Sequence, residues 1–136
     1  MEVHAEHMQN HPLAVFWLDE KGILHKVSKG VTRTPESVRD LYSAIRSTTN
    51  GKKVCALMEV SREGVSDRET REILKEEIPK TFSALAIKSS TALGKMIGTF
   101  LSVLAPTHVP VKVFDDEEKA VEWLHQKENI CGEQVD

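Results

Sequence analysis

Two apolar segments of the sequence, Val54–Val60 and Phe82–Lys88, end in polar side chains that could do chemistry. Glu59 offers a carboxylate and Lys88 an ammonium group, which can bind a polar partner or, with shifted pKa values, act as a base and an acid. Hydroxyl groups and the start of a predicted helix follow closely in the sequence. The candidate binding residues are Glu59, Ser61, Ser66, Asp67, Lys88, Ser89 and Ser90.

Histidines offer a second possible chemistry, because His4, His7 and His11 are spaced three and four residues apart, as metal ligands on one helical face would be. No cysteine and no apolar anchor accompanies them in the sequence. We therefore interpret this segment as a disordered or edge-strand chain end and predict no metal site. The other histidines are isolated, and we expect them at the surface or partly packed: His25, His108 and His125.

The usual cofactor and nucleophile motifs are missing from the sequence. Thr91–Lys95 can be compared with a phosphate-binding loop, but the leading glycine is absent and Met96 replaces the required serine or threonine. No glycine-rich dinucleotide turn follows a predicted strand, and no serine lies in a Gly-x-Ser-x-Gly turn. We therefore predict no catalytic residue and no cofactor.

Composition restricts the class of protein. The 136 residues fit one domain, and a hydrophobic fraction of 40% suffices for a core. A formal net charge of −3 gives no basic surplus for nucleic acid. The most apolar stretch, residues 92–105, contains Lys95 and is followed by Pro106, and the start of the chain is unlike a secretory signal, so we expect no membrane segment. Because Cys55 lies in an apolar run and Cys131 in a polar tail, we predict no disulfide and a reducing cytoplasm.

Short apolar runs and capping residues predict alternating strands and helices. The first two strands are joined by a hairpin loop at Asp19–Gly22. Thr34 caps the first helix and Ser66 the second, the latter in a capping box with Glu69. Strands are expected at residues 14–19, 23–28, 54–60, 82–88 and 111–114. Helices are expected after residues 34, 66 and 91, and the acidic run Asp115–Glu118 forms the first turn of a last helix.

This order of elements predicts an α/β fold. Helices between short apolar strands require right-handed crossovers, which give a mainly parallel sheet of about five strands with an antiparallel strand at the N-terminal end. Four helices alternate with the later strands. We place a flexible segment at residues 1–12, a single domain at 13–126 and a polar tail at 127–136.

The pattern resembles the STAS-like domains, which have the SpoIIAA-like fold. The resemblance rests on the strand end Leu57–Ser61, the strand Phe82–Lys88, the helix Ser90–Phe100 and the ending Val113–Leu124. These segments look like those of bacterial STAS/SEC14-type proteins of unassigned function. The resemblance covers roughly residues 14–124 and implies a regulatory or interaction domain.

The STAS-like domains are relatives of the anti-sigma-factor antagonists. In those proteins, an Asp-Ser-Ser-Gly motif carries a serine whose phosphorylation controls the binding of a kinase-like partner. The matching segment here is Ser66–Glu69, which puts Asp67 at the place of the acceptor serine and Glu69 at that of the glycine. A phosphate on Ser66 would be repelled by both carboxylates, although the helix dipole favours it. The departure favours an interaction domain without this switch.

Three functions stay open at this point. The preferred one is a non-enzymatic module that docks a protein partner, or a second copy of itself, through the strand ends and the adjoining helices. A small apolar-ligand or lipid carrier is the second, with a pocket lined by the helix expected at 92–104. An enzyme that uses Glu59 or Lys88 is the least supported, because nothing in the sequence supplies a nucleophile, cofactor loop or metal.

The helix expected at residues 92–104 also predicts self-association. Lys95 is its only charged residue, so packing on one face of a sheet would leave apolar surface exposed to water. We expect a two-fold homodimer in which this helix or the loop Pro106–Pro110 forms the interface. The interface residues are Met96, Phe100 and Leu101.

Overall fold

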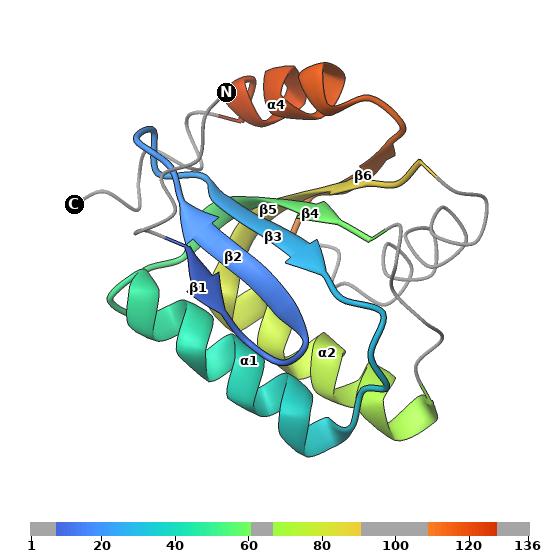
Figure 1. The fold of residues 1–136 in the computed structure, drawn as a ribbon. Coiled ribbons are helices and arrows are strands. Elements are labelled where there is room, and N and C mark those ends of the chain that lie inside the picture. Colours follow the sequence, from blue (N-terminus) through green and yellow to red (C-terminus); the bar gives the residue numbers. More distant parts are fainter. Residues whose placement is uncertain (1–7, 61–66, 91–108, 128–136) are drawn as a thin grey trace.

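The computed structural model describes residues 8–60, 67–90 and 109–127. Its strands are β1 (Gln9–Asn10), β2 (Ala14–Leu18), β3 (Leu24–Ser28), β4 (Val54–Glu59), β5 (Phe82–Lys88) and β6 (Val111–Phe114). They form one six-stranded sheet in the order β1-β2-β3-β4-β5-β6 (Figure 1). The pairs β1–β2 and β2–β3 are antiparallel, whereas β3–β4, β4–β5 and β5–β6 are parallel. The predicted α/β fold with an antiparallel N-terminal part is therefore confirmed.

Helices cover both faces of this sheet (Figure 1). Within the described residues they are α1 (Pro35–Thr48), α2 (Arg68–Thr81) and α4 (Glu117–His125). The helices α1 and α2 pack against each other on one face, and α4 packs on β4, β5 and β6 from the other. None of the helices in these ranges is long and apolar enough to cross a membrane.

The core has two parts, one on each face of the sheet. On the side of α1 and α2, buried side chains of the helices, such as Tyr42 and Ile78, meet Phe16 and Leu85 of the strands. The smaller cluster under α4 consists mostly of small side chains from β4 and β5, which let the helix come close. Its members are Cys55, Leu57, Ala84 and Ala86, with Ala120 and Leu124 of α4. Alternation along each strand divides the residues between these faces.

The β2–β3 hairpin follows the prediction. Gly22 has φ +86°, a backbone conformation that costs glycine little because it has no Cβ. The strands pair from Ala14↔Ser28 to Leu18↔Leu24, so that Trp17 lies opposite His25. This register brings these two rings to the same face of the sheet.

The helix caps confirm one prediction and correct another. Thr34 caps α1, because its Oγ1 accepts a hydrogen bond from the Ser37 amide at 3.1 Å. The predicted cap of α2 is wrong: Asp67 caps this helix, and its carboxylate accepts a hydrogen bond from the Thr70 amide at 2.8 Å. A carboxylate at this position also gains from the helix dipole. Ser66 lies outside the described residues.

The number of strands also differs from the prediction. The additional strand is β1, which pairs Gln9↔Phe16 and Asn10↔Val15 ahead of the predicted domain start. Its two polar residues carry no apolar alternation, so backbone pairing alone defines it. The helix expected at residues 92–104 lies outside the described residues, which contain three helices.

The disulfide prediction was wrong. Cys55 is disulfide-bonded and completely buried beneath α4. The polarity of the residues around a cysteine does not report its distance from another cysteine, and a disulfide depends on the spatial separation of the two Cα atoms. Cys131 lies outside the described residues. The bond also removes the cysteine argument for a reducing compartment.

The two helices α1 and α2 are joined by a buried charge. Glu77 is buried, and its Oε1 lies 2.7 Å from Nη1 of Arg46. The same Nη1 donates a hydrogen bond to Thr81 Oγ1 at 2.9 Å, so the Glu77 contact is an ion pair and not a well-aligned hydrogen bond. Elsewhere between these helices, Arg39 and Glu76 pair at 3.3 Å with both side chains about half exposed.

Replacing the arginine of the buried pair and that of the exposed pair is expected to lower the free energy of unfolding by very different amounts. Arg46→Met leaves the buried Glu77 carboxylate without its nearest cation and is expected to lower the free energy of unfolding by about 3 kcal/mol. Arg39→Met removes an exposed pair and is expected to cost about 0.5 kcal/mol. Urea unfolding of both variants measures the difference, and equal losses would contradict the structural role of Glu77.

Candidate functional site

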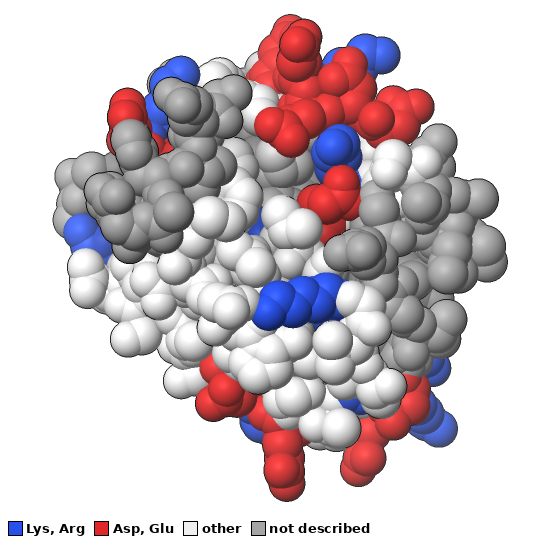
Figure 2. Space-filling view, viewed as in Figure 1, with Lys and Arg blue, Asp and Glu red and all other residues white. Residues whose placement is uncertain are grey.

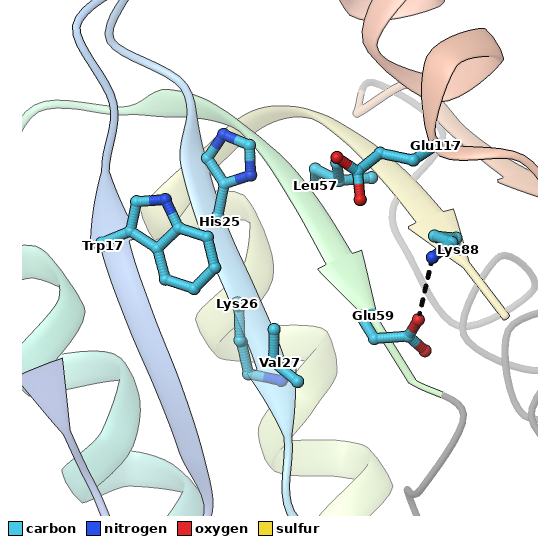
Figure 3. A pocket seen from close by; sticks show the side chains of 8 residues that line it. All are labelled: Trp17, His25, Lys26, Val27, Leu57, Glu59, Lys88 and Glu117. Carbon is cyan, nitrogen blue, oxygen red and sulfur yellow. Dashed lines mark ion pairs between the residues drawn. The ribbon is translucent and has the colours of Figure 1, made fainter. Parts of the chain in front are cut away.

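A cavity of about 70 Å³ lies on the α4 side of the sheet, and we call it the His25 pocket (Figure 3). Residues of β2, β3, β4 and β5 form its floor and sides, and the first residue of α4 reaches over it. The cavity is large enough for a few water molecules or a chemical group of a few non-hydrogen atoms. It is lined by Trp17, His25, Lys26, Val27, Leu57, Glu59, Lys88 and Glu117.

The orientation of His25 is set by Asp19 in the hairpin loop. One oxygen of Asp19, Oδ1, accepts hydrogen bonds from the amides of Lys21 and Ile23, each at 2.9 Å. The other oxygen, Oδ2, lies 2.8 Å from Nε2 of His25. Burial raises the pKa of Asp19, but the hydrogen bonds from His25 and from the Ile23 amide lower it by more, so the pKa lies below its usual value. An ionised Asp19 accepts the Nε2 proton of His25.

The His25 ring therefore presents its second nitrogen to the pocket. Figure 3 shows Nδ1, the nitrogen next to the side-chain attachment, turned toward the side where Glu117 and Leu57 lie. Trp17 stacks on the ring with a centroid distance of 5.1 Å and an interplanar angle of 4°. The indole Nε1 of Trp17 is buried and has no hydrogen-bond partner among the described residues. The pocket thus holds a fixed ring acceptor beside a buried donor.

The far end of the pocket is formed by the ion pair between Glu59 and Lys88. These residues are register partners on β4 and β5, and Lys88 Nζ lies 3.4 Å from Glu59 Oε2 (Figure 3). Both side chains are about a quarter exposed. Because the two side chains are about three-quarters buried, their charges are largely desolvated and the pair forms a fixed polar border of the pocket.

Glu117 comes from the start of α4. Asp116 caps this helix, since its carboxylate accepts a hydrogen bond from the Glu118 amide at 2.9 Å. The cap fixes the first turn, from which the Glu117 carboxylate extends over Leu57 toward His25 (Figure 3). Glu117 is exposed on its outer side and makes no ion pair within the described ranges.

The structure brings together only part of the predicted site. Glu59 and Lys88 line the pocket, as the parallel arrangement of β4 and β5 requires. Ser89 is completely buried, and its amide donates a hydrogen bond to Phe114 O at 3.0 Å, whereas Ser90 is exposed. Asp67 serves as a helix cap, and hydrogen bonding by Thr70 lowers its pKa. The remaining predicted residues lie outside the described ranges: Ser61, Ser66, Met96, Phe100 and Leu101.

Sequence reasoning missed most of the pocket. His25 was expected to be isolated, but it is 8% exposed and bonded to Asp19. Strand alternation and the two-strand register could have found it, because they place Trp17 opposite His25. The position of Glu117 depends on how α4 crosses the sheet, which no local pattern reports.

The described part of the chain contains no cluster of potential metal ligands. No group of three or more His, Cys, Asp or Glu residues there could hold an ion. His11, one of the three spaced histidines, is buried with Nε2 at 2.8 Å from Asp40 Oδ2, while its Nδ1 accepts a hydrogen bond from the Leu13 amide at 3.0 Å. These contacts of His11 hold the backbone just before β2 in place. His4 and His7 lie outside the described residues.

The fold defines the class of protein. A solved structure from Shewanella loihica PV-4, an uncharacterized protein of the DUF3478 family with a SpoIIAA-like fold, is similar with a TM-score of 0.54. The two sequences are 18% identical, and the match covers 86% of this chain and 90% of that one. The likeness confirms the SpoIIAA-like fold inferred from the sequence.

The sequence itself gives the family. Residues 16–128 match the model of DUF7793, a domain of unknown function, and the chain belongs to this family. The match includes every residue that lines the His25 pocket. No protein of curated function matches the chain.

The lowered pKa of Asp19 predicts an acid-dependent loss of stability. Because the folded pKa lies below the reference value of 3.8, the carboxylate stabilises the fold above that pH, and this contribution is lost as the pH falls through the folded pKa. Asp19→Asn keeps the shape of the loop but removes the charge. The wild type is expected to exceed this variant in free energy of unfolding near neutral pH and to approach it in acid.

Urea unfolding from about pH 7 down to about pH 3 checks this expectation. Glu20→Gln changes the neighbouring exposed carboxylate and serves as the matched control. A difference between wild type and Asp19→Asn that stays constant over the whole range would contradict the assignment of an ionised Asp19 to the His25 contact.

Proposed function

We propose that the chain is a non-enzymatic STAS-like interaction module that docks a protein partner beside the His25 pocket. The docking surface is the face of β2 and β3 on the side of α4, bordered by the Glu59–Lys88 pair. The observation that carries the proposal is a row of apolar side chains on this face that stay partly exposed: Val15, Trp17 and Val27.

The row follows from the register of the hairpin. Val15 lies opposite Val27, and Trp17 lies opposite His25, on the same face. The helix α4 packs on β4, β5 and β6, so it does not bury these side chains as it buries Cys55 and Ala86. Figure 2 shows mostly uncharged side chains over this region of the molecule and acidic side chains gathered over α4. An apolar row with a charged border is the usual composition of a protein interface.

The alternative of a lipid carrier has less support. Its expected pocket residues, among them Leu93 and Ile97, lie outside the described ranges. The His25 pocket, at about 70 Å³, is much smaller than the roughly 300–1,000 Å³ of a typical ligand site. A protein partner needs only a surface, and the proposed face supplies one.

A photo-crosslinking amino acid at position 27, in cells of the source organism, tests the proposal. The matched position is 31, because Val31 is also a valine and is 45% exposed but lies outside the sheet. We expect a discrete protein adduct from position 27 that is absent from position 31. A self-adduct would identify the partner as a second copy and support the predicted homodimer.

A second experiment tests whether binding of the captured partner requires the proposed face. Val27→Asp places a charge in the apolar row and is expected to weaken binding of the purified partner at least tenfold, whereas Val31→Asp leaves it unchanged. Calorimetry measures the affinities, and circular dichroism confirms that both variants are folded. Equal adducts at the two positions, or equal affinities of the two variants, would refute the proposal.

A further inference from the structure

We propose that the His25 pocket is a binding site for a primary ammonium group. The inference rests on the acceptors that face the pocket and does not depend on whether a protein docks on β2 and β3. His25 Nδ1 and the Glu117 carboxylate approach the cavity from opposite sides, with Leu57 between them (Figure 3). A group that satisfies both must carry hydrogen-bond donors, and a positively charged N–H group makes the stronger bond to the carboxylate.

His25 is the fixed element of this site. Its side chain is 10% exposed, and its Nε2 is engaged by Asp19 at 2.8 Å. In the neutral ring the Nε2 proton points to Asp19, which leaves Nδ1 with a lone pair directed into the pocket. The Trp17 ring, stacked at 5.1 Å, prevents the imidazole from tilting away.

The charges around the cavity favour a cation over an anion. Lys88 lies 3.4 Å from Glu59, so the charges of these two residues offset each other. Lys26 is buried, and its Nζ donates a hydrogen bond to Ser28 Oγ at 3.3 Å. Glu117, at the His25 end of the cavity, makes no ion pair within the described ranges, and the Lys26 ammonium lies beside Val27, away from it (Figure 3). A phosphate or carboxylate ligand would meet this charge and would be repelled.

The size and lining of the pocket narrow the ligand further. A volume of about 70 Å³ admits an ammonium head with a short alkyl stem, and Val27 and Leu57 provide apolar contacts for that stem. A quaternary ammonium group lacks the N–H donor that His25 Nδ1 requires. A bare metal ion is disfavoured because the described residues offer no cluster of three ligands.

Two sources can present this chemistry, namely a free small amine and the side chain of a lysine in another protein. Nuclear magnetic resonance titration with n-butylammonium chloride tests the shared chemistry at neutral pH. We expect saturable shifts of the His25 ring nitrogens and of the Leu57 and Glu117 amides. The uncharged n-butanol and the anionic butyrate, at equal concentration, are expected to leave these signals unchanged.

Matched variants assign the effect to the pocket. Glu117→Gln is expected to weaken n-butylammonium binding about tenfold, because the balancing charge is removed while the side-chain shape is kept. Glu118→Gln removes the adjacent exposed carboxylate of the same helical turn and is expected to bind like the wild type. Both positions are exposed, so both variants should fold.

The proposal is overturned if butanol or butyrate produces the same shifts, if Glu118→Gln weakens binding as much as Glu117→Gln, or if His25 shows no saturable response. A further titration with Nα-acetyl-lysine methylamide distinguishes the sources. Tighter binding than that of n-butylammonium supports a lysine of a partner protein, and weaker binding supports a free amine.

Discussion

The carboxylate of Asp19 is the contact on which the site depends. With one oxygen it closes the hairpin loop through the amides of Lys21 and Ile23, and with the other it holds Nε2 of His25. The loop closure fixes the register of β2 against β3, which places Trp17 opposite His25. The same group therefore determines the turn, the stacked rings and the direction of the free imidazole nitrogen. A partly buried carboxylate that accepts three hydrogen bonds is well compensated for its loss of hydration.

The sheet explains why this arrangement lies at a surface. The parallel strands β3, β4 and β5 need helical crossovers, and α1 and α2 cover one face, while α4 covers only part of the other. The antiparallel hairpin extends the sheet beyond α4, so the apolar side chains of its α4-facing side stay partly exposed. The pocket forms at the border between the covered and the less covered part, where Glu117 meets the strands. The proposed docking face and the proposed ammonium site share this border, but they use different side chains.

The helices and strands could be predicted from local sequence, whereas the position of the pocket residues depends on how these elements pack together. The start of α1 at Thr34 and Pro35, and the hairpin loop Asp19–Gly22, are each determined by a few neighbouring residues, and the structure shows both. Glu59 and Lys88 were predicted together because parallel strands end at the same edge of a sheet. His25, Asp19 and Glu117 meet only after the hairpin register and the crossing of α4 are set. The disulfide at Cys55 was missed for the same reason, since sequence neighbours do not report spatial distance.

The tautomer of His25 tests the account most directly, because both the role of Asp19 and the acceptor in the pocket follow from it. Two-bond nitrogen–proton correlation spectra of the imidazole ring distinguish the two neutral forms. The structure predicts a protonated Nε2 and an unprotonated Nδ1 in the neutral ring, with Asp19→Asn shifting this distribution. A neutral ring that carries its proton on Nδ1 in the wild type would contradict the account, since Asp19 would then no longer accept from His25 and the pocket would lose its acceptor.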